Sequence, residues 1–394
     1  MLRRIDIGSD KNLFVIDPKL KRQPELKFLA DEIPKTPDEA VEEARKASWG
    51  NWINSEPLLI GHVTEETGAA YLFFISELLK KKVVLLEFVD FTLLPCRRSL
   101  SYSLEWNRRY GHSGLLVIAV HSPMFDFAKD KKLVMDAVRE LGIPYPVVID
   151  NDFALWKSVE NRFWPRRILL DNKGKTHVDV AGEGSYEEFE AAIQLLLREL
   201  SPGLPCPPLL KPLRKIDDPD YAIPETSQEI FFGSKKSMPL GNATPFRNDN
   251  EEVAFKDDSQ GTYRIGAPYL DGPWAITKES IFGTLHRGDV RMTTKFSGTD
   301  VYLVARARSK NPNDVPTMVR VQIHVDKKSL TEDKVSGTHA MLNEVRRSVL
   351  QAREPKLYHI ATRLSPGLHE LTLVIDEDPL HTLEIYGLFF EHNA

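Results

Sequence analysis

Cysteine is scarce in this chain, which has only Cys96 and Cys206 among its 394 residues. Two cysteines cannot form the framework of several disulfides that holds many small secreted proteins together, so a reducing cytoplasm is the expected compartment. No apolar run approaches the ~18 residues of a membrane span. Charged residues also interrupt the amino-terminal stretch before it reaches the length of a signal peptide. The sequence therefore predicts a soluble, cytoplasmic protein without a membrane span.

A strong charge excess and a metal-binding motif are also missing. The formal net charge is -5, which gives no reason to expect nucleic acid or an anionic membrane as a partner. The histidines are scattered, and the acidic run at residues 248–252 lacks the glycine and the spacing of a calcium loop. The sequence therefore predicts no metal, no cofactor and no nucleic-acid partner.

The length of the chain and its proline distribution predict two domains with additional segments. Residues 1–50 are expected to be an extension with one helix, which begins at Thr36 and carries Pro37 and Glu39 in its first turn. Residues 201–245 contain nine of the 26 prolines. Because proline fixes the backbone and removes a donor, this segment is expected to be an extended linker or a strap over a domain surface.

Residues 51–200 alternate between strand and helix patterns, which is typical of an α/β domain. Apolar runs without alternation predict central strands, and amphipathic segments between them predict helices. The expected strands are residues 83–91, 115–120 and 167–170, and the expected helices are residues 96–110, 125–141 and 186–200.

Residues 246–394 change to a period of two, with turn-forming clusters between short apolar segments. The expected strands are residues 263–265, 290–296, 301–306, 318–325, 357–362, 367–375 and 383–390. A helical insertion is expected only at residues 341–352. This pattern predicts an all-β sandwich, with a jelly roll as the preferred arrangement.

The most informative stretch is the predicted strand that ends at Asp90 and runs into a helix with one cysteine in its first turn. A dithiol redox site needs Cys-x-x-Cys, because one thiolate attacks a disulfide and the second resolves the mixed disulfide. Here the four residues are Leu93, Leu94, Pro95 and Cys96. The first thiol of such a site is therefore absent.

Several motifs in a fixed order carry a family resemblance. Together they resemble the thioredoxin-like domain of DipZ-type and TlpA-like thiol-disulfide oxidoreductases, and residues 224–233 and 269–282 resemble the carbohydrate-binding-like sandwich that follows it in DipZ-type proteins. The resemblance covers about residues 50–390 and implies a thioredoxin-like α/β domain followed by a β-sandwich. The motifs of the first domain are residues 52–58, 84–96, 120–125, 149–152, 156, 163–165 and 182–184.

The chain departs from this family in two respects. DipZ-type proteins have an amino-terminal membrane domain, which is not expected here. In their active motif the first cysteine is the exposed nucleophile and the second is the shielded resolver, so the resemblance implies that Leu93 replaces the nucleophile and that Cys96 is the resolver. The resemblance also implies that Pro165 is cis and shapes the substrate groove opposite the cysteine.

Two functions follow as alternatives. In the first, the chain is a thioredoxin-like redox protein that exchanges thiols with a protein thiol or disulfide, or acts in antioxidant chemistry, through Cys96. Arg97 and Arg98 would lower the pKa of this thiol, and Cys206 would act as the resolving thiol if the linker folds back. In the second, Cys96 is a buried structural residue, and a non-catalytic thioredoxin fold docks a protein or a glycan.

Further polar and aromatic residues are candidates for these sites. His121, Asp152 and Glu183 lie near predicted strand ends and could be a general acid or base, although turn or capping roles explain them equally well. In the sandwich, Tyr269, Trp274 and Tyr302 are candidates for stacking on sugar rings, with burial between the sheets as the alternative for Trp274.

Overall fold

A computed structural model of the chain describes strand β1 and residues 82–392, apart from residues 223, 237–238, 244, 247, 285–289, 310, 312–313, 315, 337–338 and 377–379. The chain divides into two compact units, Met1–Leu213 and Arg214–Ala394. We call the described parts of these the α/β unit and the β unit. The boundary lies within the predicted proline-rich segment. The expected helix at Thr36 and the motif at residues 52–58 lie outside the described residues.

A six-stranded sheet forms the centre of the α/β unit, with the strand order β1-β4-β3-β2-β5-β6. The neighbouring strands from β1 to β2 are parallel, whereas β5 and β6 are antiparallel to their neighbours. Strands β2 and β3 are buried along their whole length, as expected for continuous apolar runs. The strands are β1 (Leu59–His62), β2 (Val83–Val89), β3 (Leu115–His121), β4 (Val147–Ile149), β5 (Arg166–Leu170) and β6 (Thr176–Ala181).

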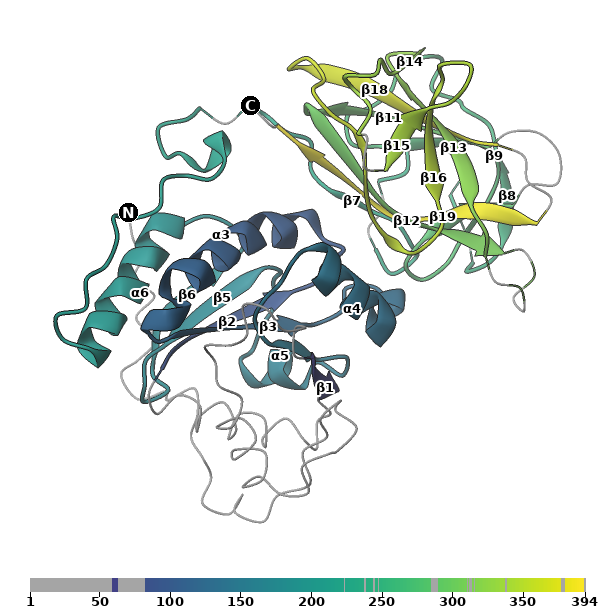
Figure 1. Ribbon diagram of the computed structural model, residues 1–394. Helices are drawn as coiled ribbons and strands as arrows, with labels where there is room; N and C mark the ends of the chain where they lie inside the picture. Colours follow the sequence, from purple (N-terminus) through teal and green to yellow (C-terminus); the bar gives the residue numbers. More distant parts are fainter. Residues whose placement is uncertain are drawn as a thin grey trace. The chain divides into compact units, whose positions relative to one another are not determined.

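Helices α3 and α6 lie side by side over one face of this sheet (Figure 1). Aromatic side chains join them: Tyr102 stacks on Tyr186, and Trp106 stacks on Phe189. Such pairs stabilise a helix contact beyond the area that they bury. The helices of the unit are α3 (Leu94–Tyr110), α4 (Lys131–Glu140), α5 (Ala154–Ser158) and α6 (Tyr186–Leu200), with short 3-10 turns at Gly111–Ser113 and Asp126–Lys129.

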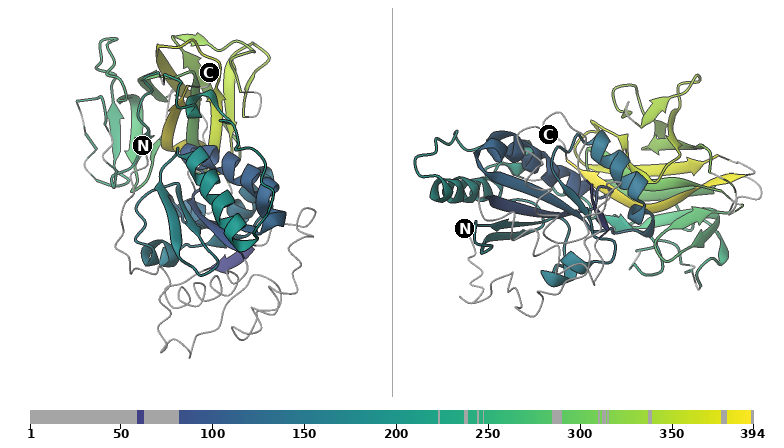
Figure 2. Two further views of the ribbon diagram at one scale, coloured as in Figure 1. Left: turned by 90° about the vertical axis from the view of Figure 1, so that its left-hand side faces the viewer. Right: turned by 60° about the horizontal axis from the view of Figure 1, so that its bottom comes forward.

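The β unit contains thirteen strands, and every pairing between named strands is antiparallel. Its longest strand, the yellow β19, runs along the unit (Figure 2). The strands are β7 (Ile230–Phe231), β8 (Glu252–Phe255), β9 (Pro268–Ile276), β10 (Ile281–Gly283), β11 (Val290–Ser297), β12 (Asp300–Ser309), β13 (Val319–Val325), β14 (Lys328–Ser329), β15 (Ala340–Leu342), β16 (Ser348–Ala352), β17 (Lys356–Ala361), β18 (Leu368–Ile375) and β19 (His381–Glu391).

Strand β9 connects two groups of strands in the β unit. Its first half pairs with β11, and its second half pairs with β8 and β10. The change takes place at Gly272, which has a φ of 90°, a value that glycine adopts at little cost. Trp274 follows directly and is fully buried in the core of the unit.

Two sequence predictions for the β unit were wrong. The expected helix at residues 341–352 is instead the hairpin of β15 and β16. The Asn343 side chain accepts from the backbone N–H groups of Val345 and Arg347 and closes the turn. The expected strand at residues 263–265 is reduced to a single bridge between Ile265 and Lys295. Short segments with few apolar residues fit more than one period, which explains both errors.

Across the part of the chain that the structure describes, no helix combines the length and the apolar character needed to cross a membrane.

Candidate functional site

The degenerate motif lies at the junction of β2 and α3, where the sequence predicts it. Leu93 is the N-cap residue of α3, Pro95 lies within its first turn, and Cys96 follows. Proline is favoured there because the first helical N–H groups have no partner within the helix. Leu93 is 5% exposed and Cys96 is 1% exposed. An attacking thiol must reach solvent, so this arrangement lacks an accessible nucleophile.

The surroundings of Cys96 keep its thiol protonated. Burial raises the pKa of Cys96 well above its ordinary value, and the negative charges of Asp90, Glu87 and Glu183 raise it further. The backbone N–H of Asp90 donates to the sulfur at 3.4 Å and opposes this shift only in part. Because the thiolate is the nucleophile, burial and a raised pKa both disfavour attack by the Cys96 thiol.

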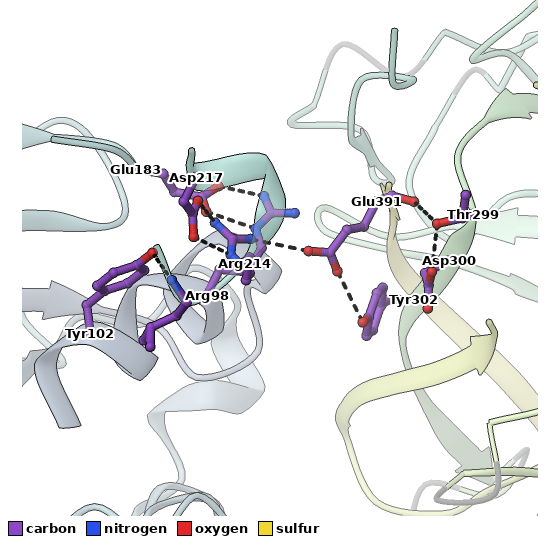
Figure 3. A network of polar contacts seen from close by, with 10 residues as sticks. Arg98, Tyr102, Glu183, Arg214, Asp217, Thr299, Asp300, Tyr302 and Glu391 are labelled. Atoms are coloured by element: carbon purple, nitrogen blue, oxygen red, sulfur yellow. Dashed lines mark hydrogen bonds and ion pairs between the residues drawn. The ribbon is translucent and has the colours of Figure 1, made fainter. Parts of the chain in front are cut away.

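Arg97 and Arg98 do not supply the positive charge that the sequence suggested. The Arg97 Nε donates to the Phe91 carbonyl at 2.7 Å, which ties the helix to the preceding loop. Arg98 makes a two-pronged ion pair with Glu183, with N···O distances of 2.9 and 2.5 Å (Figure 3). The negative charge of Glu183 thus neutralises the positive charge of Arg98. The expected lowering of the Cys96 pKa by these arginines is therefore corrected, because that pKa is raised.

Asp90 organises the loops around the motif, a role that sequence reasoning missed. Its buried carboxylate accepts from the Thr92 backbone N–H at 2.7 Å and from the Thr92 hydroxyl at 2.6 Å. Its second oxygen accepts from the Met124 backbone N–H at 2.6 Å. One carboxylate therefore fixes both the loop before α3 and the loop after β3. The available signal was an acidic residue at the end of an apolar strand.

Pro165 follows a cis peptide bond with Trp164, which is the geometry that the sequence predicts. The Trp164 indole N–H donates to the Ser122 carbonyl at 2.9 Å, and its ring packs against Trp156. Pro165 itself is buried. The part of Pro165 in shaping a substrate groove stays a prediction.

Cys206 lies at the opposite end of α3 from Cys96. The neighbouring Pro207 carbonyl accepts from Gln194, which also donates to the hydroxyl of Tyr110 at the last residue of α3. Cys96 is fourteen residues earlier in this helix, about 21 Å away at 1.5 Å per residue. Both cysteines are free thiols. The structure therefore does not bring Cys206 within the ~7 Å between Cα atoms that a disulfide with Cys96 needs.

The other polar candidates have structural partners. His121 is buried against Phe91, and burial lowers its pKa. Asp152 is exposed, and the helix-capping part proposed for it belongs to Asp150, whose oxygens accept from the backbone N–H groups of Leu155 and Trp156. The error is two residues, because either aspartate fits a cap from sequence alone.

Asp150 gives the α/β unit a pH dependence. Burial raises the pKa of Asp150 to about 6, above the ordinary value of about 3.9 in an unfolded chain. Its contribution to stability is therefore complete below about pH 4 and is lost as the pH rises through about 6. The free energy of unfolding is expected to fall by up to about 3 kcal/mol over this range.

Urea unfolding of the α/β unit at about pH 4 and about pH 7 measures this effect. Asp150→Asn, which resembles the protonated form, is the comparison, and it should reduce the difference between the two pH values. An equal difference in the wild type and the variant would contradict the assignment.

Two buried charged residues lie on neighbouring strands of the sheet, and one of them, Glu87, raises the pKa of Cys96. Glu87 and Arg167 occupy paired positions on β2 and β5, and both are fully buried. Ser99 donates to Glu87 at 2.7 Å, and burial raises the pKa of this carboxyl. The Arg167 guanidinium donates to the Gly184 carbonyl and lies over the Tyr186 ring. Sequence reasoning missed this pair, although each residue is a charge within an apolar run.

The candidate sugar-binding aromatics of the β unit are not open platforms. Trp274 and Tyr269 are buried. Tyr302 is half-buried, its ring stacks on His359, and its hydroxyl donates to Glu391 (Figure 3). Stacking on a sugar needs a ring face open to solvent. Glycan binding through these three residues is therefore not supported by their placement.

Among the described residues, no group of three or more His, Cys, Asp or Glu side chains could hold a metal ion.

Comparison with known proteins finds similar proteins that include a thiol-disulfide oxidoreductase. No family model matches the chain. The protein DipZ of Mycobacterium bovis is 30% identical over 226 residues, which is 57% of this chain and 31% of DipZ. The thiol-disulfide oxidoreductase YkuV of Bacillus subtilis is 25% identical over 148 residues, 38% of this chain and 88% of YkuV. The chain thus spans about a third of the length of DipZ.

Solved structures with similar folds include a thioredoxin-like protein in its oxidized form, which is 25% identical with a TM-score of 0.30 and covers 35% of this chain and 86% of its own. StoA of Bacillus subtilis is 18% identical with a TM-score of 0.25 and covers 28% of this chain and 81% of its own. The sequence relationships show that the chain is similar to DipZ over part of DipZ and to the thiol-disulfide oxidoreductase YkuV over most of YkuV.

Proposed function

We propose that the α/β unit is a thioredoxin-fold binding module, which docks a protein partner and carries out no dithiol exchange. The observation that carries this proposal is the pair of Leu93 at the N-cap and Cys96 buried in the first turn. Exchange through a dithiol needs an exposed, acidified thiol followed by a second thiol three residues later. Neither requirement is met at this junction.

The surface near the motif supports docking of a partner. Phe163 is 58% exposed and precedes Trp164 and the cis Pro165 in the chain. Trp164, Trp156 and Phe153 form one aromatic cluster behind it. Exposed aromatic side chains beside a rigid loop are typical of sites where one protein anchors another. In this proposal, the loop of Pro165 keeps the shape of a peptide-binding groove.

Alkylation of Cys96 in the folded full-length chain tests the proposal. We expect Cys96 to react with iodoacetamide on the order of a thousandfold more slowly than in urea, because its thiol is buried and protonated. Mass spectrometry of digested protein separates its reaction from that of Cys206, which is half-buried and serves as the internal reference. A rate close to that of a free thiol, with an apparent pKa at or below about 8.5, would reject the binding-module proposal.

Fast alkylation of Cys96 in the folded chain would favour the alternative function. This function is thiol exchange through Cys96 alone with a protein thiol or disulfide. Its support is the relationship to YkuV and DipZ, since YkuV is a thiol-disulfide oxidoreductase. An external thiol would then have to resolve the mixed disulfide, because Cys206 lies at the other end of α3.

For the β unit, a jelly-roll arrangement and glycan binding stay proposals. The two groups of antiparallel strands joined through β9 support a sandwich. A role as a protein-docking or structural module has the better support, because Tyr269 and Trp274 are buried. Titration of the full-length chain with soluble oligosaccharides decides between the two.

A further inference from the structure

The proline-rich segment 204–213 is held against α3 and α6 by polar side chains. The Gln194 amide donates to the Pro207 carbonyl at 2.8 Å, and Arg109 donates to the Pro208 carbonyl. In the other direction, two backbone N–H groups of the segment donate to helix side chains. Leu210 donates to Glu190 at 2.8 Å. Leu213 donates to the Tyr102 hydroxyl at 2.9 Å, and Figure 3 shows this tyrosine. The side chains of Tyr102, Arg109, Glu190 and Gln194 thus form hydrogen bonds with the backbone of this segment.

The segment buries little of its own surface. Its four prolines, Lys211 and Leu213 are exposed, and its remaining side chains are only half-buried. Its attachment therefore rests on the four hydrogen bonds rather than on an apolar core, and such bonds are individually weak in water. Proline also keeps the segment extended whether or not it is attached. Detachment then requires no unfolding of the helices beneath it.

The four side chains that hold the segment also have partners of their own. Buried Glu190 accepts from Arg109 and from the Tyr110 hydroxyl, in addition to Leu210. Gln194 donates to the Tyr110 hydroxyl, and Tyr102 stacks on Tyr186. When the segment leaves, Arg109, Glu190 and Gln194 keep hydrogen-bond partners on the two helices, and the Tyr102 ring keeps its stack on Tyr186. The side chains on α3 and α6 that bind the segment are therefore largely held in place by contacts within the two helices.

We propose that residues 204–213 form a latch, a tethered ligand that opens from its four side-chain partners on α3 and α6 while the α/β unit stays folded. Opening turns ten residues of fixed chain into a tether, at about 3.1 Å per residue in the extended proline conformation. It also exposes the side chains that bound them. This device is independent of whether Cys96 is reactive.

Hydrogen exchange of the full-length chain tests the latch. The amides of Leu210 and Leu213 are expected to exchange on the order of a hundredfold faster than the central amides of α3 and α6, because local opening costs less than unfolding. Tyr102→Phe removes the acceptor of Leu213 and keeps the ring that stacks on Tyr186. It should speed exchange at residues 209–213 about fivefold, the effect of one neutral hydrogen bond, without changing exchange in the helices.

Arg109→Ala and Arg108→Ala are a matched pair of neighbours for this test. Arg109 holds the latch, whereas Arg108 is 72% exposed and pairs with Glu105 on the same helix. Faster exchange at 209–213 and faster alkylation of Cys206 are expected only for Arg109→Ala, with Cys96 still protected. The proposal is overturned if latch and helix amides exchange with the same protection, or if Tyr102→Phe speeds both equally.

Discussion

Leu93→Cys is expected to create a dithiol site that oxidises to a disulfide with Cys96. Residue 93 is the N-cap of α3 and Cys96 lies three residues later, which is the spacing that a Cys-x-x-Cys site needs. The helix N-terminus favours the thiolate form of the new cysteine. Leu93 is only 5% exposed, and an attacking thiol must reach solvent. The disulfide should therefore form, whereas insulin reduction should rise far less than attack within one molecule would allow. The wild type should be no faster than a free monothiol.

Leu94→Cys is the matched control for this variant. Leu94 is 4% exposed, close to the 5% of Leu93, and also lies at the start of α3. Residues 94 and 96 point away from the helix axis in nearly opposite directions. A cysteine at residue 94 therefore cannot form a disulfide with Cys96 without distortion. Mass spectrometry after mild oxidation should find the loss of two hydrogens only in Leu93→Cys. If the introduced thiol and Cys96 both stay reduced, the assigned geometry of the motif is wrong.

The outcome also bears on the proposal that the α/β unit carries out no dithiol exchange. A dithiol site needs a first thiol and a reactive second thiol, and Leu93→Cys supplies only the first. The charges of Asp90, Glu87 and Glu183 still raise the pKa of Cys96. A reductase that stays slow after Leu93→Cys, although its disulfide forms, would locate the loss in the surroundings of the second thiol as well. The binding-module proposal would then have two independent supports.

Much of the fold can be predicted from the sequence because the central elements have long, uniform patterns. Strand β2 is apolar except for Glu87, β3 is apolar up to its last residue, and α6 has one apolar face. Each was therefore expected within two residues of its observed bounds. Strand β6 gave no such signal, because it lies at the edge of the sheet and is largely half-buried. Strand β4 has only three residues.

The chemistry of the site was less predictable because it depends on contacts distant in sequence. The position of Cys96 followed from the motif, but its burial depends on the segments packed over α3. The direction of Arg98 depends on Glu183, which is 85 residues away. The pairing of Glu87 with Arg167 depends on the register between β2 and β5. A single sequence contains no measure of such a register beyond the pattern of apolar residues.

Asp90→Ala is expected to lower the free energy of unfolding of the α/β unit by about 3 kcal/mol, because two backbone N–H groups lose a charged acceptor. These are the N–H groups of Thr92 and Met124, which hold the loops on both sides of the motif. The variant should also lower the pKa of Cys96, since the charge of Asp90 is one of those that raise it. Urea unfolding, monitored by hydrogen exchange of the amides in α3 and β3, measures the loss of stability. The rate of Cys96 alkylation as a function of pH measures the change in its pKa.

Asp136→Ala provides the comparison for Asp90→Ala. Asp136 is an aspartate of the same unit, but it is half exposed and pairs with Lys132 one helical turn away. Exposed pairs of this kind contribute little to stability, so this variant should unfold like the wild type. If Asp90→Ala is equally stable, the loops are held by other contacts. If it is unstable while the pKa of Cys96 is unchanged, burial alone keeps that thiol protonated, and the loss of the first cysteine alone cannot account for the inert site.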